Sequence, residues 1–83
     1  MTTHLENILL NDRGIALNPA TGETFRLIGP ALHLVRLLQQ GAPTRALLDY
    51  LLETYDIDRA TAQRDLDTFI AMLEKMNWVE VSS

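Results

Sequence analysis

Three short apolar runs, separated by turn-forming residues, occupy the first 28 positions of the chain. The turns are the segments NDRG and NPATGE, whose asparagine, proline and glycine residues favour tight reversals. Successive short strands joined by tight turns form an antiparallel meander, and its first and third strands are edges. The sequence therefore predicts three antiparallel strands, over residues 6–10, 14–18 and 23–28.

The rest of the chain carries apolar residues at helical spacing. Pro30 suits the first turn of a helix and Gly41 is a natural end for it, while Asp58 is a plausible N-cap and Asn77 a left-handed C-terminal residue for the last helix. The segment WVEV (78–81) then alternates like a short terminal strand or tail. We expect three helices, over residues 31–40, 45–55 and 59–76.

Three strands that can cover only one face, followed by three amphipathic helices, predict an α+β domain of the winged helix-turn-helix kind. At 83 residues we expect a single domain, residues 1–83, with its core over about 6–81. A chain of this size buries only about 60 to 65% of its unfolded surface. Nearly every large apolar residue is then needed for the core, and little is left to wall a deep catalytic cavity.

Charge argues against a nucleic-acid partner. The chain has a net charge of -4 and a single lysine, whereas affinity for DNA or RNA comes largely from clustered Lys and Arg. A winged-helix DNA-binding regulator is nevertheless the main alternative, because such folds place a helix in the major groove. The third predicted helix carries three basic residues against four acidic ones, a net of -1: Arg59, Arg64 and Lys75 against Asp58, Asp65, Asp67 and Glu74.

The sequence gives little support for a catalytic site, a metal site or a cofactor site. The chain has no cysteine, His4 lies in a terminus that we expect to fray, and His33 has no ligand partner at helical spacing. The start of the chain lacks the features of a signal peptide, and no apolar run approaches the roughly 18 residues of a membrane span. We expect a cytoplasmic protein that is not an enzyme and has no membrane partner.

Helix 45–55 leaves a second alternative open. Its residues Leu48, Leu52 and Tyr55 add apolar surface that could exceed what so small a core absorbs. Such surface suits a small protein-docking subunit, and it would also suit a homodimer.

The pattern of apolar residues and turns resembles the PqqD family, the coenzyme PQQ synthesis protein D-like peptide chaperones, over about residues 6–81. The resemblance lies in Leu27 closing the third strand, an ALHLVRLL helix ending at Gly41, the segment LLDYLLETYDID, and a DLDTFIAMLEKMNWV helix with its apolar tail. Two positions depart from the family pattern. Ile28 stands where the family often has asparagine, and Asn77 where it often has glycine.

The resemblance implies a RiPP recognition element, a domain that binds the leader segment of a ribosomally synthesised precursor peptide. Such a domain presents the peptide to a modifying enzyme, such as a radical or cyclising maturase. In this family the leader lies as an added strand against the third strand, in a groove walled by the third helix. Main-chain hydrogen bonds then supply generic affinity, and side-chain pockets supply sequence choice.

On this hypothesis the leader-binding residues are Thr24, Phe25, Arg26, Leu27, Ile28, Asp65, Thr68 and Met72. Period-two alternation sends Phe25 and Leu27 to the core face, and the other strand residues to the opposite face or the rim. Met72 offers a flexible thioether for varied apolar side chains, while Asp65 and Arg26 could read charge.

Ordinary structural roles stand beside these assignments. Thr24 and Arg26 also suit solvated strand positions, and Met72 also suits the margin of the core. Asp65 could instead pair with Arg64 or Arg59, although exposed pairs of that sort contribute only about 0 to 1 kcal/mol.

Overall fold

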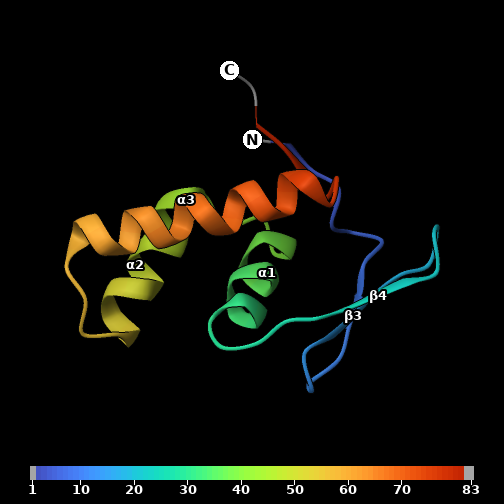
Figure 1. Cartoon of the computed structure of the whole chain (residues 1–83), viewed down its shortest axis with the longest axis horizontal. Helices are drawn as coiled ribbons and strands as arrows, with labels where there is room; N and C mark the ends of the chain where they lie inside the picture. The colour runs from blue at the N-terminus through green and yellow to red at the C-terminus, as the bar shows by residue number, and fades with distance from the viewer. Residues whose placement is uncertain (1, 82–83) are drawn as a thin grey trace.

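A three-stranded antiparallel sheet followed by three helices forms the body of the molecule (Figure 1). The computed structural model describes residues 2–81. The sheet has the order β2-β3-β4, with β2 at Leu9–Leu10, β3 at Ile15–Asn18 and β4 at Glu23–Arg26. The helices are α1 (Ala31–Gln39), α2 (Thr44–Thr54) and α3 (Arg59–Lys75). The predicted α+β architecture is confirmed, and each helix boundary lies within one residue of its predicted place.

A second, two-stranded sheet joins the two ends of the chain. Strand β1 (Thr2–Thr3) pairs antiparallel with β5 (Val79–Glu80), and the His4 N–H donates to the Trp78 carbonyl at 2.8 Å. In Figure 1 the first and last described segments accordingly lie side by side. The predicted terminal strand is therefore present, but the expectation that the segment around His4 frays is wrong. Its partner is a strand at the other end of the described chain, which no local pattern reveals.

Strand β2 is shorter than the strand predicted over residues 6–10, because residues 6–8 are not extended. The Ile8 N–H donates to the Leu5 carbonyl at 3.1 Å, which closes a turn. The Gln39 side-chain amide, from the end of α1, donates to the same Leu5 carbonyl at 3.1 Å and to the Ile8 carbonyl at 3.0 Å. Leu5 and Ile8 are both buried. The two apolar side chains are thereby buried, and the two carbonyls hydrogen-bonded, in a turn rather than in a strand.

Strand β4 also ends earlier than predicted, at Arg26 instead of Ile28. Its hydrogen bonding to β3 continues for one more residue, since the Leu27 N–H donates to the Gly14 carbonyl at 2.7 Å. Gly14 has a φ of +83°, and a Cβ at this position would lie 2.4 Å from the Leu27 carbonyl oxygen. A side chain is thus excluded where the two backbones meet.

Side chains from all three helices and the sheet share one core. Its largest fully buried members include Trp78, Leu47, Leu66 and Leu73. Helix α3 lies across α1 and α2 in Figure 1, and α2 and α3 are in direct contact. No buried side chain among residues 2–81 is polar or charged, so burial of apolar surface holds these elements together.

Both ends of α3 are capped as predicted. The Asp58 carboxylate accepts the Thr61 backbone N–H at 2.7 Å. Asn77 has a φ of 60°, and the next residue, Trp78, donates its N–H to the Leu73 carbonyl at 2.9 Å. This reversal is a Schellman turn, which ends a helix at a left-handed residue. After this turn the buried Trp78 ring packs against Phe25 of β4, edge to face, with 5.4 Å between the ring centroids.

Within residues 2–81, the helices all fall short of the length and apolar character that crossing a membrane requires.

We predict that Gly14→Ala destabilises the domain more than Gly22→Ala does. Both glycines have positive φ, so alanine strains the backbone at either position. Only at Gly14 does the added Cβ also meet another backbone, because nothing lies within 4 Å of a Cβ at Gly22. In urea denaturation Gly22→Ala should lower the free energy of unfolding by about 1 kcal/mol, and Gly14→Ala by clearly more. Equal losses would contradict the close approach at Gly14.

We also predict that Asp58 contributes to acid sensitivity. Hydrogen bonds from Thr61 hold the pKa of Asp58 below its usual value of 3.8. Because the folded chain favours the carboxylate, this stabilisation is complete above that usual value and is lost as the pH falls through the lower folded pKa. Asp58→Asn keeps a cap acceptor but removes the titrating proton. Its melting temperature should fall less steeply than that of the wild type below about pH 4, and superimposable acid profiles would refute this role.

Candidate functional site

The free edge of β4 is the first component of the site. Hydrogen-bonded positions alternate along an antiparallel strand, and Leu27 bonds to β3 through Gly14. Phe25, paired with Ala16, therefore bonds to β3 as well, whereas the main-chain N–H and C=O groups of Thr24 and Arg26 point away from β3. No strand in residues 2–81 covers that side of β4. The sheet thus ends in unpaired main-chain donors and acceptors.

Beside this edge lies a hollow of about 200 Å³ between β4 and the C-terminal half of α3. Its walls come from the strand, from the start of α1 and from α3. They are formed by Phe25, Arg26, Leu27, Ile28, Ala31, Met72 and Met76.

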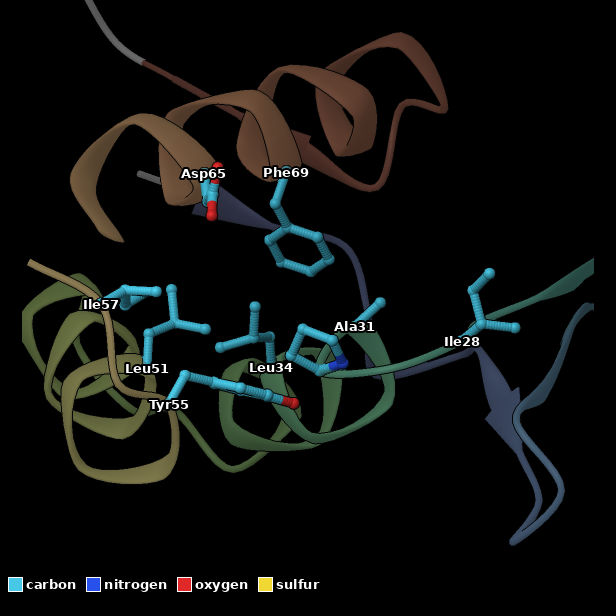
Figure 2. A pocket seen from close by; sticks show the side chains of 9 residues that line it. Ile28, Ala31, Leu34, Leu51, Tyr55, Ile57, Asp65 and Phe69 are labelled. Atoms are coloured by element: carbon cyan, nitrogen blue, oxygen red, sulfur yellow. The ribbon is translucent and has the colours of Figure 1, made fainter. Parts of the chain in front are cut away.

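A second hollow, of about 310 Å³, continues past the end of β4 between α3 and the helices α1 and α2. In Figure 2, Phe69 points from α3 toward Ala31 and Leu34 of α1, and Ile28 and Ile57 lie toward opposite ends. The residues that line it are Ile28, Pro30, Ala31, Leu34, Leu51, Tyr55, Ile57, Asp65 and Phe69.

Ile28 and Ala31 line both hollows, which therefore adjoin each other along α3. We call the two hollows, together with the β4 edge, the edge groove. The described residues include five exposed large apolar side chains, and Ile28, Met72 and Tyr55 of these line the edge groove at 72%, 40% and 39% exposure. Apolar surface is thus concentrated where the sheet also leaves its backbone unpaired, which is a pattern of binding sites.

The strand residues take the faces that alternation predicts. Leu27 is buried and Phe25 is half-buried against Trp78, while Thr24, Arg26 and Ile28 are exposed. All except Thr24 line the edge groove. Thr24 instead lines a different hollow, on the outer face of the sheet, and its backbone alone faces the groove.

The three binding residues predicted on α3 do not share one hollow. Met72 and Asp65 line the two hollows in turn, but Thr68 lines neither, and its hydroxyl donates to the Arg64 carbonyl at 3.0 Å. Asp65 forms no ion pair within residues 2–81, so the alternative in which it pairs with a neighbouring arginine is not what the structure shows.

Several groove residues were not predicted from the sequence. Phe69 and Met76 join Asp65 and Met72 at spacings of four, three and four residues, which places all four along one stripe of α3. That spacing was visible in the sequence, but Phe69 and Met76 fitted the core stripe equally well. Ala31, Leu34, Leu51, Tyr55 and Ile57 come from other elements, and only the tertiary arrangement brings them together.

The edge groove is suited to hold an extended peptide. It offers main-chain hydrogen-bonding groups along β4, apolar walls on α1 and α3, and two charged side chains, Arg26 and Asp65. These are the components used when a peptide adds as a strand to a sheet edge. Residues 2–81 contain no cluster of three or more His, Cys, Asp or Glu side chains that could hold a metal ion.

Two solved structures share this fold across nearly the whole chain. One is described as TbiB1 in complex with the TbiA(beta) leader peptide. It matches with a TM-score of 0.83 and 24% identity, over 100% of this chain and 99% of that one. The other, described as lasso peptide synthetase B1 complexed with the leader peptide, has a TM-score of 0.70 and 25% identity, over 90% and 88% of the two chains. No curated protein sequence matches the chain.

One protein family matches most of the sequence. Residues 13–79 match the family described as coenzyme PQQ synthesis protein D (PqqD). The match spans β3, β4, all three helices and the start of β5, and so includes every residue of the edge groove. The resemblance seen in the sequence is therefore confirmed: this chain belongs to the PqqD family.

Proposed function

We propose that the chain is a RiPP recognition element that binds the leader segment of a ribosomally synthesised precursor peptide. The leader adds as a fourth strand beside β4 and lies in the edge groove. The observation that carries this proposal is the coincidence of the unpaired β4 backbone with an apolar depression that continues from it. Either feature alone is common on small domains, whereas the two together match one mode of peptide recognition.

The comparisons support the same function. Membership of the PqqD family joins this chain to peptide chaperones, and both solved structures of similar fold are described as complexes with a leader peptide. Their identity to this chain is low. The proposal for individual residues therefore rests on the geometry of the edge groove.

We assign the contacts as follows. The backbones of Thr24 and Arg26 pair with the leader, and Ile28 and Met72 contact its apolar side chains. Phe25 and Leu27 hold β4 in place from the core side and line the floor of the groove. Thr68 makes no direct contact in this assignment, because its hydroxyl is already bonded within α3.

The affinity of such a site is limited by the disorder of the free peptide. Ordering a flexible leader offsets much of the interaction energy, so we expect a dissociation constant from micromolar to sub-micromolar, about -8 to -10 kcal/mol. Recognition of one leader among many then depends on the side-chain pockets.

The proposed role is capture and presentation, with no catalytic step performed by this chain. A separate modifying enzyme, such as a radical or cyclising maturase, acts on the bound precursor. We place this capture in the cytoplasm, where ribosomes make the precursor.

Blocking the β4 edge tests this function. Thr24→Pro removes an outward N–H and leaves the bonds between β3 and β4 intact, since proline is tolerated at the open side of an edge strand. We expect the affinity for synthetic leader peptides of the precursors encoded beside the gene to fall on the order of tenfold or more, from the lost bond and the obstructing ring. Fluorescence anisotropy of labelled peptides measures this change.

Thr24→Val is the matched control, because it keeps the N–H and a branched side chain. Its affinity should fall far less than that of Thr24→Pro, since the variant keeps the backbone donor and the Thr24 side chain does not line the edge groove. Both variants should retain the wild-type circular dichroism spectrum. Full leader affinity in a folded Thr24→Pro variant would show that the peptide does not add to β4.

A further inference from the structure

The two charged residues that line the edge groove have opposite signs and lie in different parts of it. Arg26 lines the hollow beside β4, and Asp65 lines the hollow beyond it. Each is the only charged residue of its hollow, and neither forms an ion pair within residues 2–81. Both side chains are exposed and available to a bound peptide.

Arg26 faces the position that an added strand would occupy. Its main-chain groups point to the open edge, so a leader residue would lie directly opposite it with side chains on the same face. Within the sheet its only cross-strand neighbour is Ile15, which carries no charge. An acidic leader residue opposite Arg26 would thus complete an otherwise unpaired cross-strand position.

Strand pairing cannot extend far beyond Ile28. The Ile28 carbonyl accepts the Ala31 N–H at 3.3 Å, and Gly29 has a positive φ, so the chain turns into α1. A leader that runs antiparallel to β4, as β3 does, has its N-terminal side at this end. Residues of such a leader upstream of the paired segment would leave the strand there, beside the second hollow that Asp65 lines.

We propose that the edge groove selects leaders by charge order, requiring a basic residue on the N-terminal side of an acidic one. The acidic residue pairs with Arg26 and the basic residue with Asp65, beside the ring of Tyr55 in the same hollow. This inference rests on the proposed leader binding. It adds that opposite charges in the two parts of the groove fix the register of a peptide that lies antiparallel to β4.

The register of the antiparallel leader needs such a determinant because the other contacts do little to fix it. Apolar walls accept apolar side chains in more than one register, and a short edge offers few main-chain bonds. A leader with the reverse charge order places its basic residue against Arg26 and its acidic residue against Asp65. Like charges in contact discriminate against that arrangement even where both orders fit sterically.

Selection from a phage-displayed library of random peptides tests the proposal. The wild-type chain should enrich peptides with Lys or Arg N-terminal to Asp or Glu at a constant separation. The double variant R26D/D65R, which keeps the net charge, should enrich the opposite order. A selected peptide resynthesised with its two charges exchanged should bind the wild type on the order of tenfold more weakly and recover that loss on the double variant.

The control exchanges two charges outside the groove. R64D/D67R also keeps the net charge, alters α3 residues that line neither hollow, and should select the same peptides as the wild type. The milder pair R26Q/D65N should lose the charge order while keeping the apolar preference, which preserves the test if R26D/D65R unfolds.

The possible failures are distinguishable. Peptides that bind the wild type but not Thr24→Pro, and that show no charge order or the same order with R26D/D65R, would overturn the charge-order proposal and leave strand addition standing. If no peptide is enriched by the wild type over Thr24→Pro, strand addition fails and the charge-order proposal fails with it.

Discussion

The hydrogen bond from the Leu27 N–H to the Gly14 carbonyl is the contact on which the groove depends. At 2.7 Å it holds the end of β4 against β3, and only a glycine allows the two backbones to approach so closely. It also decides which main-chain groups remain free. Because Leu27 bonds to β3, the main-chain groups of Thr24 and Arg26 point to the open side, and Ile28 lines both hollows. The close approach of the Gly14 and Leu27 backbones thus sets which main-chain groups are free along the edge of β4.

The second wall of the groove is held by the turn that follows α3. Asn77 in the left-handed conformation reverses the chain, and Trp78 then packs edge to face on Phe25. One aromatic contact therefore links the end of α3 to the inner face of β4. This packing helps to hold the end of α3 at a fixed distance from the strand. The pairing of β1 with β5 ties the terminal segment beyond Trp78 to the start of the chain.

The sequence predicted the helices well because their signals are local. Asp58 and Asn77 each act within a few residues of the helix end that they cap, and apolar spacing defines the buried face. The strand ends were less predictable because distant groups decide them. Gln39 holds the segment around Leu5 and Ile8 in a turn from more than 30 residues away.

The groove was predictable only in part, for a related reason. Its strand edge and two of its α3 residues followed from a family resemblance and periodicity. Phe69 could not be distinguished from a core residue by spacing, since a helix stripe can border the core and a groove at once. Leu51, Tyr55 and Ile57 join the site through the packing of α2 against α3, which no pattern in α2 alone encodes.

The most direct test of strand addition is a backbone-amide NMR titration of the labelled chain with leader peptides, combined with hydrogen exchange. The amides of Thr24 and Arg26 point to the open edge, whereas those of Phe25 and Leu27 already bond to β3. Binding should therefore slow exchange at Thr24 and Arg26 far more than at Phe25 and Leu27, with accompanying shifts at Met72. Binding that leaves Thr24 and Arg26 exchanging as in the free chain, with shifts confined to the outer surfaces of α1 and α2, would contradict the account.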